Sequence, residues 1–460
     1  MDITTKLKLV LGDEKVLTDK QLESRYNHIW TMNTALKAKA YVLPSTTEEV
    51  AIICETCYKY KQPMVVFGGL TNLVGGTETN GDEVVISMEK MNKVVSLDHA
   101  GRTMTVQSGI ILEEIQNLAK ENDLFFPLSF GAKGSCQIGG CISTNAGGIR
   151  VLKYGMTRQL VLGLEVVLPN GEVISSLKQM LKDNSGYDLK QLFIGAEGTL
   201  GIVTTAVLKL EEIPVSRNSV FLAFSQFEKI IRFLKLVKKG LGGQLSAFEF
   251  IERSAYETLT NNESMWKPPI SHGYNYYILI ETTGGHKEKD AALLEELLEN
   301  TMIEDQLFED AVFAYKHSDL EWFWNIREDV SILANIYKYD QHFDVSLPLV
   351  HMQDYITQVK QELESIAEVD ECFVFGHLAD GNMHFIVGKS SNSVVLKNEI
   401  NEIVYSSLKH WGGSISAEHG IGLHKKNYLS YCREESEIEL MRTLKKTFDP
   451  EHLLNTSKIF

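Results

Sequence analysis

The stretch Gly131-Ala132-Lys133-Gly134-Ser135-Cys136-Gln137-Ile138-Gly139-Gly140-Cys141-Ile142-Ser143-Thr144-Asn145-Ala146-Gly147-Gly148 decides the fold of this chain. Glycine and small polar residues dominate it, so it cannot be a regular helix or strand throughout. Glycine tolerates positive φ and presents bare backbone N–H groups, which can line an anion such as a pyrophosphate. Upstream, Gly68-Gly69-Leu70-Thr71-Asn72-Leu73-Val74-Gly75-Gly76 has the same character. Neither stretch is a strict G-x-G-x-x-G or a P-loop, but two of them in one half of the chain predict a nucleotide-cofactor site.

Regular elements flank both glycine-rich stretches. We expect a capping box in which Ser45 lies three residues before Glu48, at the start of an apolar helix. Asn170-Gly171 predicts a hairpin turn at the end of a strand that begins near Leu164. The other elements predicted in the first half are a helical lead-in at 1–35, strands at 41–44, 63–67, 84–87, 103–107 and 202–207, and a helix at 111–121.

From about Pro214 the pattern changes. Long amphipathic helices are predicted at 226–239, 290–300 and 352–366, and strands such as 276–280 lie between them. Because glycine becomes rare here outside turns, we place a domain boundary at 212–216.

Length and composition narrow the class of protein. A chain of 460 residues is too long for one ordinary core, so we expect two domains and consider three lobes. A net charge of −16 disfavours nucleic acid and anionic membrane surfaces. We find no apolar run long enough to span a membrane and no targeting segment, so a cytoplasmic protein is expected. Cys54 and Cys57 fall in a helical pattern and are interpreted as buried thiols rather than a metal or redox pair.

A second informative region joins Gly376-His377-Leu378-Ala379-Asp380-Gly381-Asn382-Met383-His384 to Ala417-Glu418-His419-Gly420-Ile421-Gly422. The turn signal Asp380-Gly381-Asn382 predicts that His377 and His384 face each other across the mouth of a hairpin. With Glu418 they make a His/His/Glu set, which suits Zn²⁺ or a similar divalent ion with open positions. The alternative is a pair of strand-end histidines satisfied by the backbone. His419 is a candidate base, because imidazole titrates near working pH.

The glycine-rich stretches, together with the block Lys182-Asp183-Asn184-Ser185-Gly186-Tyr187-Asp188-Leu189-Lys190-Gln191-Leu192-Phe193-Ile194-Gly195-Ala196-Glu197-Gly198-Thr199-Leu200-Gly201-Ile202, resemble the vanillyl-alcohol oxidase superfamily of flavoproteins. The resemblance is strongest to D-2-hydroxyglutarate dehydrogenases, with D-lactate dehydrogenases beside them, and it covers nearly the whole chain. It implies an α+β fold with an FAD-binding domain at 1–214. A substrate domain with an antiparallel sheet would occupy 215–415, and a C-terminal segment, 416–460, would pack back on the first domain.

The resemblance also implies which residues contact the cofactor and the metal. FAD is expected to be non-covalent, because the first glycine loop lacks the histidine to which several relatives attach flavin. The metal ligands would be His377, His384 and Glu418, with His419 as the catalytic base. The residues expected around FAD are Gly68, Gly69, Leu70, Thr71, Asn72, Gly134, Ser135, Gly139, Thr144, Asn145, Gly148, Gly198, Ile202 and Asn455.

The resemblance extends to a substrate site, where it is incomplete. Arg327 matches an arginine that holds a substrate carboxylate, and Ser331, four residues on, is expected on the same side of a helix. His342 stands where the 2-hydroxyglutarate enzymes have a lysine, and Ile386 where they have an asparagine. Lys338 is nearby in sequence but out of register. The two departures favour a smaller or less acidic D-2-hydroxy acid, while the rest of the chain favours 2-hydroxyglutarate.

The predicted function is therefore FAD- and metal-dependent oxidation of a D-2-hydroxy acid, with hydride passing to flavin N5. A flavin-dependent oxidase of sugars or alcohols and an electron-relay flavoprotein subunit are the alternatives. The electron acceptor stays open between a quinone, an electron-transfer flavoprotein and a second subunit. The oligomeric state also stays open, with a homodimer as one candidate.

Overall fold

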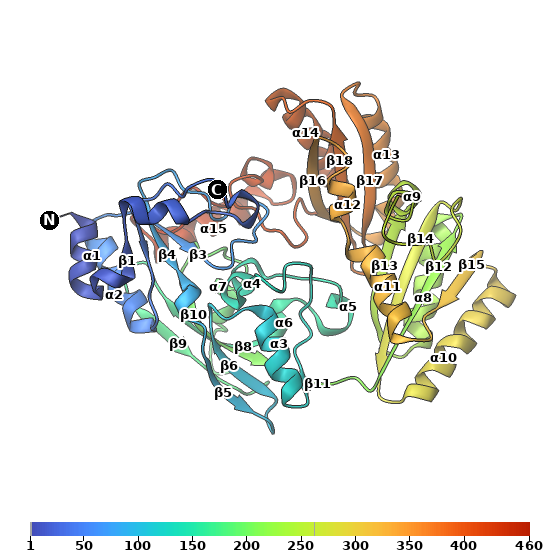
Figure 1. Cartoon of the computed structure of the whole chain (residues 1–460), viewed down its shortest axis with the longest axis horizontal. Helices are drawn as coiled ribbons and strands as arrows, with labels where there is room; N and C mark the ends of the chain where they lie inside the picture. Colours follow the sequence, from blue (N-terminus) through green and yellow to red (C-terminus); the bar gives the residue numbers. More distant parts are fainter. Residues whose placement is uncertain (1, 262) are drawn as a thin grey trace. The chain divides into compact units, whose positions relative to one another are not determined.

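The computed structural model describes residues 2–261 and 263–460, which form two compact units (Figure 1). The first unit contains residues 1–148, 155–213 and 418–460, and the second contains 149–154 and 214–417. Each unit therefore draws on segments that are far apart in the sequence, and each is described separately below.

The N-terminal part of the first unit is a four-stranded sheet with the order β1-β2-β4-β3. Strands β2, β4 and β3 are parallel, whereas β1 is antiparallel to β2. Helix α2 packs on this sheet through Val50, Ile53 and the buried thiol of Cys54, as the sequence predicted for its cysteines. The bounds are α1 (Ile3–Leu11), β1 (Val16–Leu17), β2 (Ala40–Val42), α2 (Thr47–Lys59), β3 (Met64–Phe67) and β4 (Val84–Ser87). The predicted helical lead-in is α-helical only in α1, and 3₁₀ turns follow at Asp13–Lys15, Asp19–Ser24 and Ile29–Thr31.

The start of α2 corrects a prediction by one residue. Thr46, not Ser45, is the N-cap, and its side chain accepts a hydrogen bond from the Glu49 N–H at 3.3 Å. Glu49 reaches back to the Ser45 N–H at 2.8 Å and also pairs with Lys15. Ser45 and Thr46 are both residue types that cap helices well. The ion pair with Lys15, which is distant in sequence, favours the helix start in which Thr46 and Glu49 form the cap.

The first unit also contains a five-stranded antiparallel sheet with the order β5-β6-β10-β8-β9 and a two-stranded antiparallel sheet formed by β11 and β7. The predicted Asn170-Gly171 hairpin joins β8 to β9. The chain end returns to the first sheet, because Leu454 forms a bridge to Met64 and is fully buried. The remaining bounds are β5 (Val94–Asp98), β6 (Thr103–Gln107), α3 (Leu112–Glu121), β7 (Leu124–Phe125), α4 (Ile138–Thr144), α6 (Thr157–Leu160), β8 (Val161–Val167), β9 (Val173–Ser176), α7 (Lys190–Phe193), β10 (Ile202–Lys209), β11 (Glu211–Glu212) and α15 (Glu435–Phe448).

The second unit is built on a seven-stranded antiparallel sheet with the order β15-β12-β14-β13-β17-β18-β16. The predicted antiparallel sheet of an α+β fold is thus confirmed. Its strands are β12 (Ser216–Phe224), β13 (Leu245–Glu252), β14 (Tyr276–Gly284), β15 (Asp310–Phe313), β16 (Tyr339–Ser346), β17 (Val369–His377) and β18 (Asn382–Lys389). Its helices are α5 (Val151–Tyr154), α8 (Phe227–Gly240), α9 (Arg253–Leu259), α10 (Lys287–Asn300), α11 (His317–Glu328), α12 (Ser331–Ala334), α13 (Met352–Glu364) and α14 (Val394–Trp411).

The two faces of this sheet have different partners, because successive side chains of a strand point to opposite faces. Phe375 and Ile386 lie in one core with side chains of α9, α11 and α12. On the other face, Phe248 contacts Phe233 of α8, and Phe385 contacts Tyr355 of α13. The face that packs against α9, α11 and α12 is the one that carries the candidate site.

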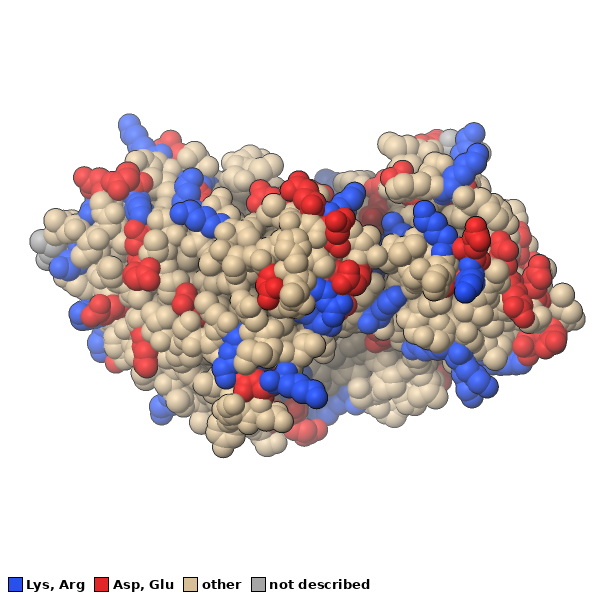
Figure 2. Space-filling model, turned by 90° about the horizontal axis from the view of Figure 1, so that it is seen from below, with Lys and Arg blue, Asp and Glu red and all other residues tan. Residues whose placement is uncertain are grey.

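Charged side chains are mixed on the surface. On the face shown in Figure 2, lysines and arginines are interspersed with acidic residues rather than gathered into a broad basic patch. In the part of the chain that the structure describes, every helix is too short or too polar to cross a membrane.

Candidate active site

The hairpin predicted between His377 and His384 is present. Strands β17 and β18 are joined by a short 3₁₀ turn at Leu378–Asp380 and by Gly381, whose φ is +83°. His377 pairs with Asn382, and Asn382 is two residues from His384, so both imidazoles lie on one face. Their ring centroids are 5.5 Å apart. The geometry therefore brings two nitrogen donors together at the hairpin mouth.

Glu249 on β13 lies directly opposite His377 and is only 1% exposed. Its Oε1 is 2.8 Å from His377 Nδ1, and its Oε2 is 2.8 Å from Arg327 Nη2. Burial opposes ionisation of this carboxyl, but the neighbouring His377 and Arg327 outweigh that effect and hold its pKa below the usual value. Glu249 is thus a buried carboxyl group between two of the predicted site residues.

Asp344 on β16 organises the segment that leads to Glu418 and His419. It is fully buried, and its Oδ2 accepts a hydrogen bond from the Ala417 N–H at 3.0 Å. Its Oδ1 lies 3.8 Å from His384 Nδ1. The bridge between Ser346 and Ser414 holds the same segment.

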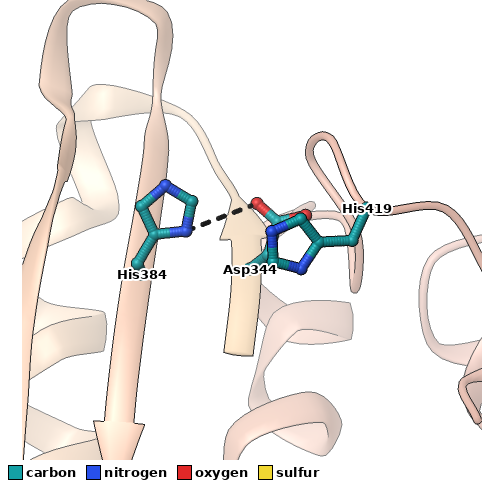
Figure 3. A group of neighbouring side chains, drawn as sticks. All are labelled: Asp344, His384 and His419. Atoms are coloured by element: carbon teal, nitrogen blue, oxygen red, sulfur yellow. Dashed lines mark ion pairs between the residues drawn. The ribbon is translucent and has the colours of Figure 1, made fainter. Parts of the chain in front are cut away.

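Two overlapping groups of potential metal ligands result. Figure 3 shows Asp344, His384 and His419 as neighbours, and one donor atom from each lies within 4.8 Å of the others. One donor atom from each of the predicted ligands, His377, His384 and Glu418, also lies within 4.8 Å of the others. Imidazole and carboxylate donors at this separation fit a divalent ion such as Zn²⁺.

The predicted substrate residues have different environments. Arg327, on α11, is 5% exposed and lies over the Phe375 ring at 5.1 Å. Its Nε has no hydrogen-bond partner within the described ranges, and its Nη2, although close to Glu249, lacks hydrogen-bond alignment. A buried guanidinium that keeps unused donors is suited to a carboxylate ligand.

Ser331 corrects a prediction. It was expected on the same helix face as Arg327, but α11 ends at Glu328 and Ser331 begins a separate helix, α12. Its hydroxyl is exposed and donates to Asp329 at 2.6 Å. The four-residue spacing fails because the helix is interrupted, so the i,i+4 rule does not apply.

His342 and Ile386 are directly opposite each other on β16 and β18. His342 is partly exposed and 2.6 Å from Asp340, whereas Ile386 is buried. Lys338 is exposed and lies over the Tyr339 ring. The two positions that depart from the 2-hydroxyglutarate pattern therefore form one cross-strand pair.

In the first unit, the two glycine-rich stretches lie against each other. A Cβ on Gly69 would be 2.1 Å from the Ser135 carbonyl oxygen, so only glycine allows this approach. Within the second stretch, Gln137 Oε1 is buried and has no hydrogen-bond partner among the described residues. A Cβ on Gly140 would meet nothing within 4 Å. Close backbone, open space and a buried polar atom together fit a bound nucleotide cofactor.

Other predicted cofactor residues have mainly structural hydrogen bonds. Asn72 binds Thr77 and the Gly76 N–H, and Asn145 binds the Arg158 N–H. Asn455 joins distant segments, because it accepts from the Val66 N–H and donates to the Glu197 carbonyl. The positions of the other predicted residues are Gly68 and Leu70 to Thr71 after β3, Gly134 and Ser135 before α4, Gly139 and Thr144 in α4, Gly148 after it, Gly198 before β10, and Ile202 at its start.

Three carboxylates that contact predicted segments were not predicted: Glu197 in the first unit, and Glu249 and Asp344 in the second. Glu197 accepts hydrogen bonds from the Ile421 N–H at 2.7 Å and the Gly422 N–H at 2.8 Å. Burial raises its pKa despite these bonds. A signal was available for Glu249, because an acid between Phe248 and Phe250 in the interior of the strand Leu245–Glu252 requires a buried partner.

Comparison with known proteins supplies a family. Residues 38–176 match the family described as FAD binding domain, and residues 213–459 match FAD linked oxidases, C-terminal domain. A D-2-hydroxyglutarate dehydrogenase, mitochondrial, of Danio rerio is 36% identical over 96% of this chain and 82% of its own length. A mitochondrial protein of Schizosaccharomyces pombe named as a D-lactate dehydrogenase is 35% identical over 97% of this chain and 86% of its own. The D-2-hydroxyglutarate–pyruvate transhydrogenase DLD3 of Saccharomyces cerevisiae is 34% identical over 98% of this chain and 92% of its own length.

Solved structures show the same fold at lower identity. A p-cresol methylhydroxylase with substrate bound has a TM-score of 0.80 at 17% identity and covers 99% of this chain and 96% of its own. An alkyldihydroxyacetonephosphate synthase has a TM-score of 0.75 at 17% identity, covering 99% and 85%. The predicted vanillyl-alcohol oxidase type of fold is thereby confirmed.

One expectation from the sequence is wrong. A cytoplasmic protein was expected, but the relatives from Danio rerio and Schizosaccharomyces pombe are named as mitochondrial proteins. The expectation was based on finding no targeting segment and no membrane-spanning apolar run, and neither observation identifies a compartment.

The match over most of the chain shows that this protein is an FAD-linked oxidoreductase and belongs to the family that includes the D-2-hydroxyglutarate and D-lactate dehydrogenases.

Proposed function

We propose that this enzyme oxidises a D-2-hydroxy acid, of the D-2-hydroxyglutarate or D-lactate type, to the 2-oxo acid with the help of FAD and a divalent metal ion. The observation that carries the proposal is the pair of imidazoles of His377 and His384 at the hairpin mouth of the second unit, whose ring centroids are 5.5 Å apart. The names of the relatives support the substrate class. The first unit would hold FAD non-covalently, and the second would carry the substrate.

The site residues would divide the chemistry as follows. FAD supplies a hydride acceptor at N5 and the divalent ion a Lewis acid for the substrate hydroxyl. His377, His384 and Glu418 would hold the ion. Arg327 would orient the substrate carboxylate through its unused guanidinium donors. His419 would take the hydroxyl proton, since a neutral imidazole is a competent base near pH 7.

The remaining predicted residues have smaller parts in the proposal. His342 would lie beside the substrate side chain, opposite Ile386. Ser331 donates to Asp329, so it would act on the substrate only after that bond breaks. We propose no direct contact for Ser331 in the resting enzyme.

Anaerobic reduction of the bound flavin tests the proposal. The purified protein is mixed with D-2-hydroxyglutarate, D-lactate or their L-enantiomers, and loss of the visible flavin absorbance is followed. We expect bleaching by a D-acid, and we expect a chelator to slow it and Zn²⁺ or Mn²⁺ to restore it. A flavin that none of the four acids bleaches would reject the substrate class and favour the sugar oxidase or the relay subunit.

His419→Asn separates the base from the metal site. We expect the variant to keep its flavin and metal but to reduce flavin at least about 100-fold more slowly, the size typical of a lost general base. Turnover assays then compare a quinone analogue, an electron-transfer flavoprotein and pyruvate as acceptors. Pyruvate is included because the yeast relative is named a transhydrogenase.

A further inference from the structure

Glu249 is a carboxylate in the middle of an apolar sheet. It is 1% exposed, and its neighbours on β13, Phe248 and Phe250, are buried in the core. A buried carboxylate costs free energy unless charged or hydrogen-bonding partners compensate it. The partners of Glu249 therefore indicate what the residue is for.

Both carboxylate oxygens contact residues of the candidate site. Oε1 lies 2.8 Å from His377 Nδ1, and Oε2 lies 2.8 Å from Arg327 Nη2. Because the Glu249 carboxylate also faces the Arg327 guanidinium, we assign it as the acceptor in this contact and Nδ1 of His377 as the donor. In that tautomer Nε2 keeps its lone pair and can bind a metal ion.

We infer that Glu249 is a positioning residue. Its single carboxylate orients both the proposed metal ligand His377 and the proposed substrate-binding residue Arg327. Oε1 fixes the ring orientation and tautomer of His377, and Oε2 holds the guanidinium of Arg327 nearby by charge attraction rather than by an aligned hydrogen bond. The inference rests on the proposed function. It adds that ion affinity and substrate affinity depend on the same buried side chain.

The strand geometry supports this role over simple charge compensation. Glu249 and His377 are directly opposed across β13 and β17, so the contact is built into the sheet register. Arg327 comes from α11, which packs on the same face. A compensating charge for Arg327 alone would not need to be placed opposite a candidate metal ligand.

Glu249→Gln tests the inference in the full-length, FAD-loaded enzyme. Glutamine keeps one oxygen for His377 but turns an amide NH₂ toward Arg327. Glu252→Gln is the matched control, because Glu252 is on the same strand and its carboxylate pairs with Lys360. The readouts are Zn²⁺ affinity by competition with a chromophoric chelator, KM and kcat for the best D-acid at saturating Zn²⁺, and the melting temperature.

We expect Glu249→Gln to weaken Zn²⁺ binding 10- to 100-fold, the range found when the outer partner of a metal-bound histidine is removed. KM should rise at saturating Zn²⁺, because Arg327 is no longer held. The control should leave both constants unchanged. A merely structural role would lower the melting temperature without moving the Zn²⁺ affinity of the folded protein.

Two results would overturn the inference, and they are distinguishable. If the wild type binds no Zn²⁺ at this site, the metal part of the proposed function fails and the inference fails with it. If the wild type binds Zn²⁺ and Glu249→Gln binds it equally well, only the role of Glu249 is rejected. Should Glu249→Gln not fold, Glu249→Asp is used instead, since it retains the charge but withdraws it by one methylene. Unchanged Zn²⁺ affinity in that variant would also reject the role.

Discussion

Single residues of the first unit hold segments that are distant in sequence, and Lys458 is one of them. It is 4% exposed and donates to the carbonyl oxygens of Gly76 and Glu78 at 2.6 and 3.1 Å. Burial lowers its pKa to about 8, although Glu83, Glu78 and Glu197 act in the opposite direction. The lysine is therefore charged in the folded protein at neutral pH, but at a cost.

This cost predicts a pH dependence of stability. Unfolded lysine has a pKa of about 10.4, so between about pH 8 and 10.4 the unfolded chain binds more protons than the folded one. The contribution of Lys458 to the free energy of unfolding is thus fully present above about 10.4 and is lost as the pH falls through about 8. Between these two pH values the free energy of unfolding rises by at most about 3 kcal/mol.

Urea unfolding followed by circular dichroism at several pH values checks the prediction. The free energy of unfolding of the wild type minus that of Lys458→Met should rise through this window. Lys20→Met, at an exposed lysine, should give a difference that does not change with pH. A constant difference for Lys458→Met would show that the folded pKa is not lowered.

At the same scale, the sequence predicted some site residues and missed others for a physical reason. His377 and His384 were predictable because the turn signal between them fixes a hairpin locally. Glu249 and Glu197 were missed because their partners are 128 and 224 residues away and are defined only by sheet register and loop packing. The role of a polar residue can be predicted from spacing when its partners are close in sequence. It cannot be predicted in this way when the partners are distant and only the fold brings them together.

At the scale of elements, the β17–β18 hairpin depends on Gly376. A Cβ there would lie 2.4 Å from the Asn382 carbonyl oxygen and 2.9 Å from the Met383 Cα. Both atoms belong to the backbone of β18, so no side-chain rotation can relieve the clash. The strands must separate beside the pair formed by His377 and Asn382.

We therefore expect Gly376→Ala to lower the free energy of unfolding by about 1–3 kcal/mol, as overpacking does in cores. Zn²⁺ affinity should fall as well, since the two histidines move with their strands. Chelator competition and thermal melts measure the two effects. Gly285→Ala is the control, because a Cβ at Gly285 meets nothing within 4 Å. Wild-type stability and affinity in Gly376→Ala would show that the hairpin can open without cost.

The starts and ends of helices are the features that the sequence predicts least well. Helices α3, α8 and α13 were placed within a few residues because their apolar periodicity is strong. The start of α2 was displaced because Ser45 and Thr46 are equivalent caps in sequence. The break after Glu328 was missed because the residues that follow, Asp329 and Val330, are not strong breakers. Local chemistry thus fixes the type of an element better than its ends.

At the scale of the whole molecule, the two units differ in which segments of the chain form their cores. All seven strands of the second unit lie between residues 214 and 417. The first unit needs the chain end, because Leu453 and Leu454 lie in the core beneath β2, β3 and β4. Lys445, buried beside Asp449, also donates to the Thr199 carbonyl at 2.8 Å. Sequence patterns predict each element but give no direct measure of which distant segments share a core.

This difference predicts opposite behaviour of two fragments. Fragment 214–417 should fold alone, because it contains its complete sheet. It lacks Arg150, which lies 3.1 Å from the fully buried Glu281, so we expect it to be less stable than the same unit in the intact chain. Glu281 keeps contacts with Arg217, Ser246 and Trp324, so the loss should be about 1–3 kcal/mol, the range for one lost partner of a buried charge.

Fragment 1–213 should not fold stably or retain FAD, since without residues 418–460 its core has no Leu453, Leu454 or Asn455. Size-exclusion chromatography and thermal melts by circular dichroism distinguish the two behaviours. Joining 418–460 to 1–213 through a flexible linker should restore a cooperative transition and FAD binding, and Arg150→Met in the intact chain should reproduce the loss in the second unit. A fragment 1–213 that melts cooperatively and holds FAD would show that the returning C-terminal segment only covers a core which is already complete.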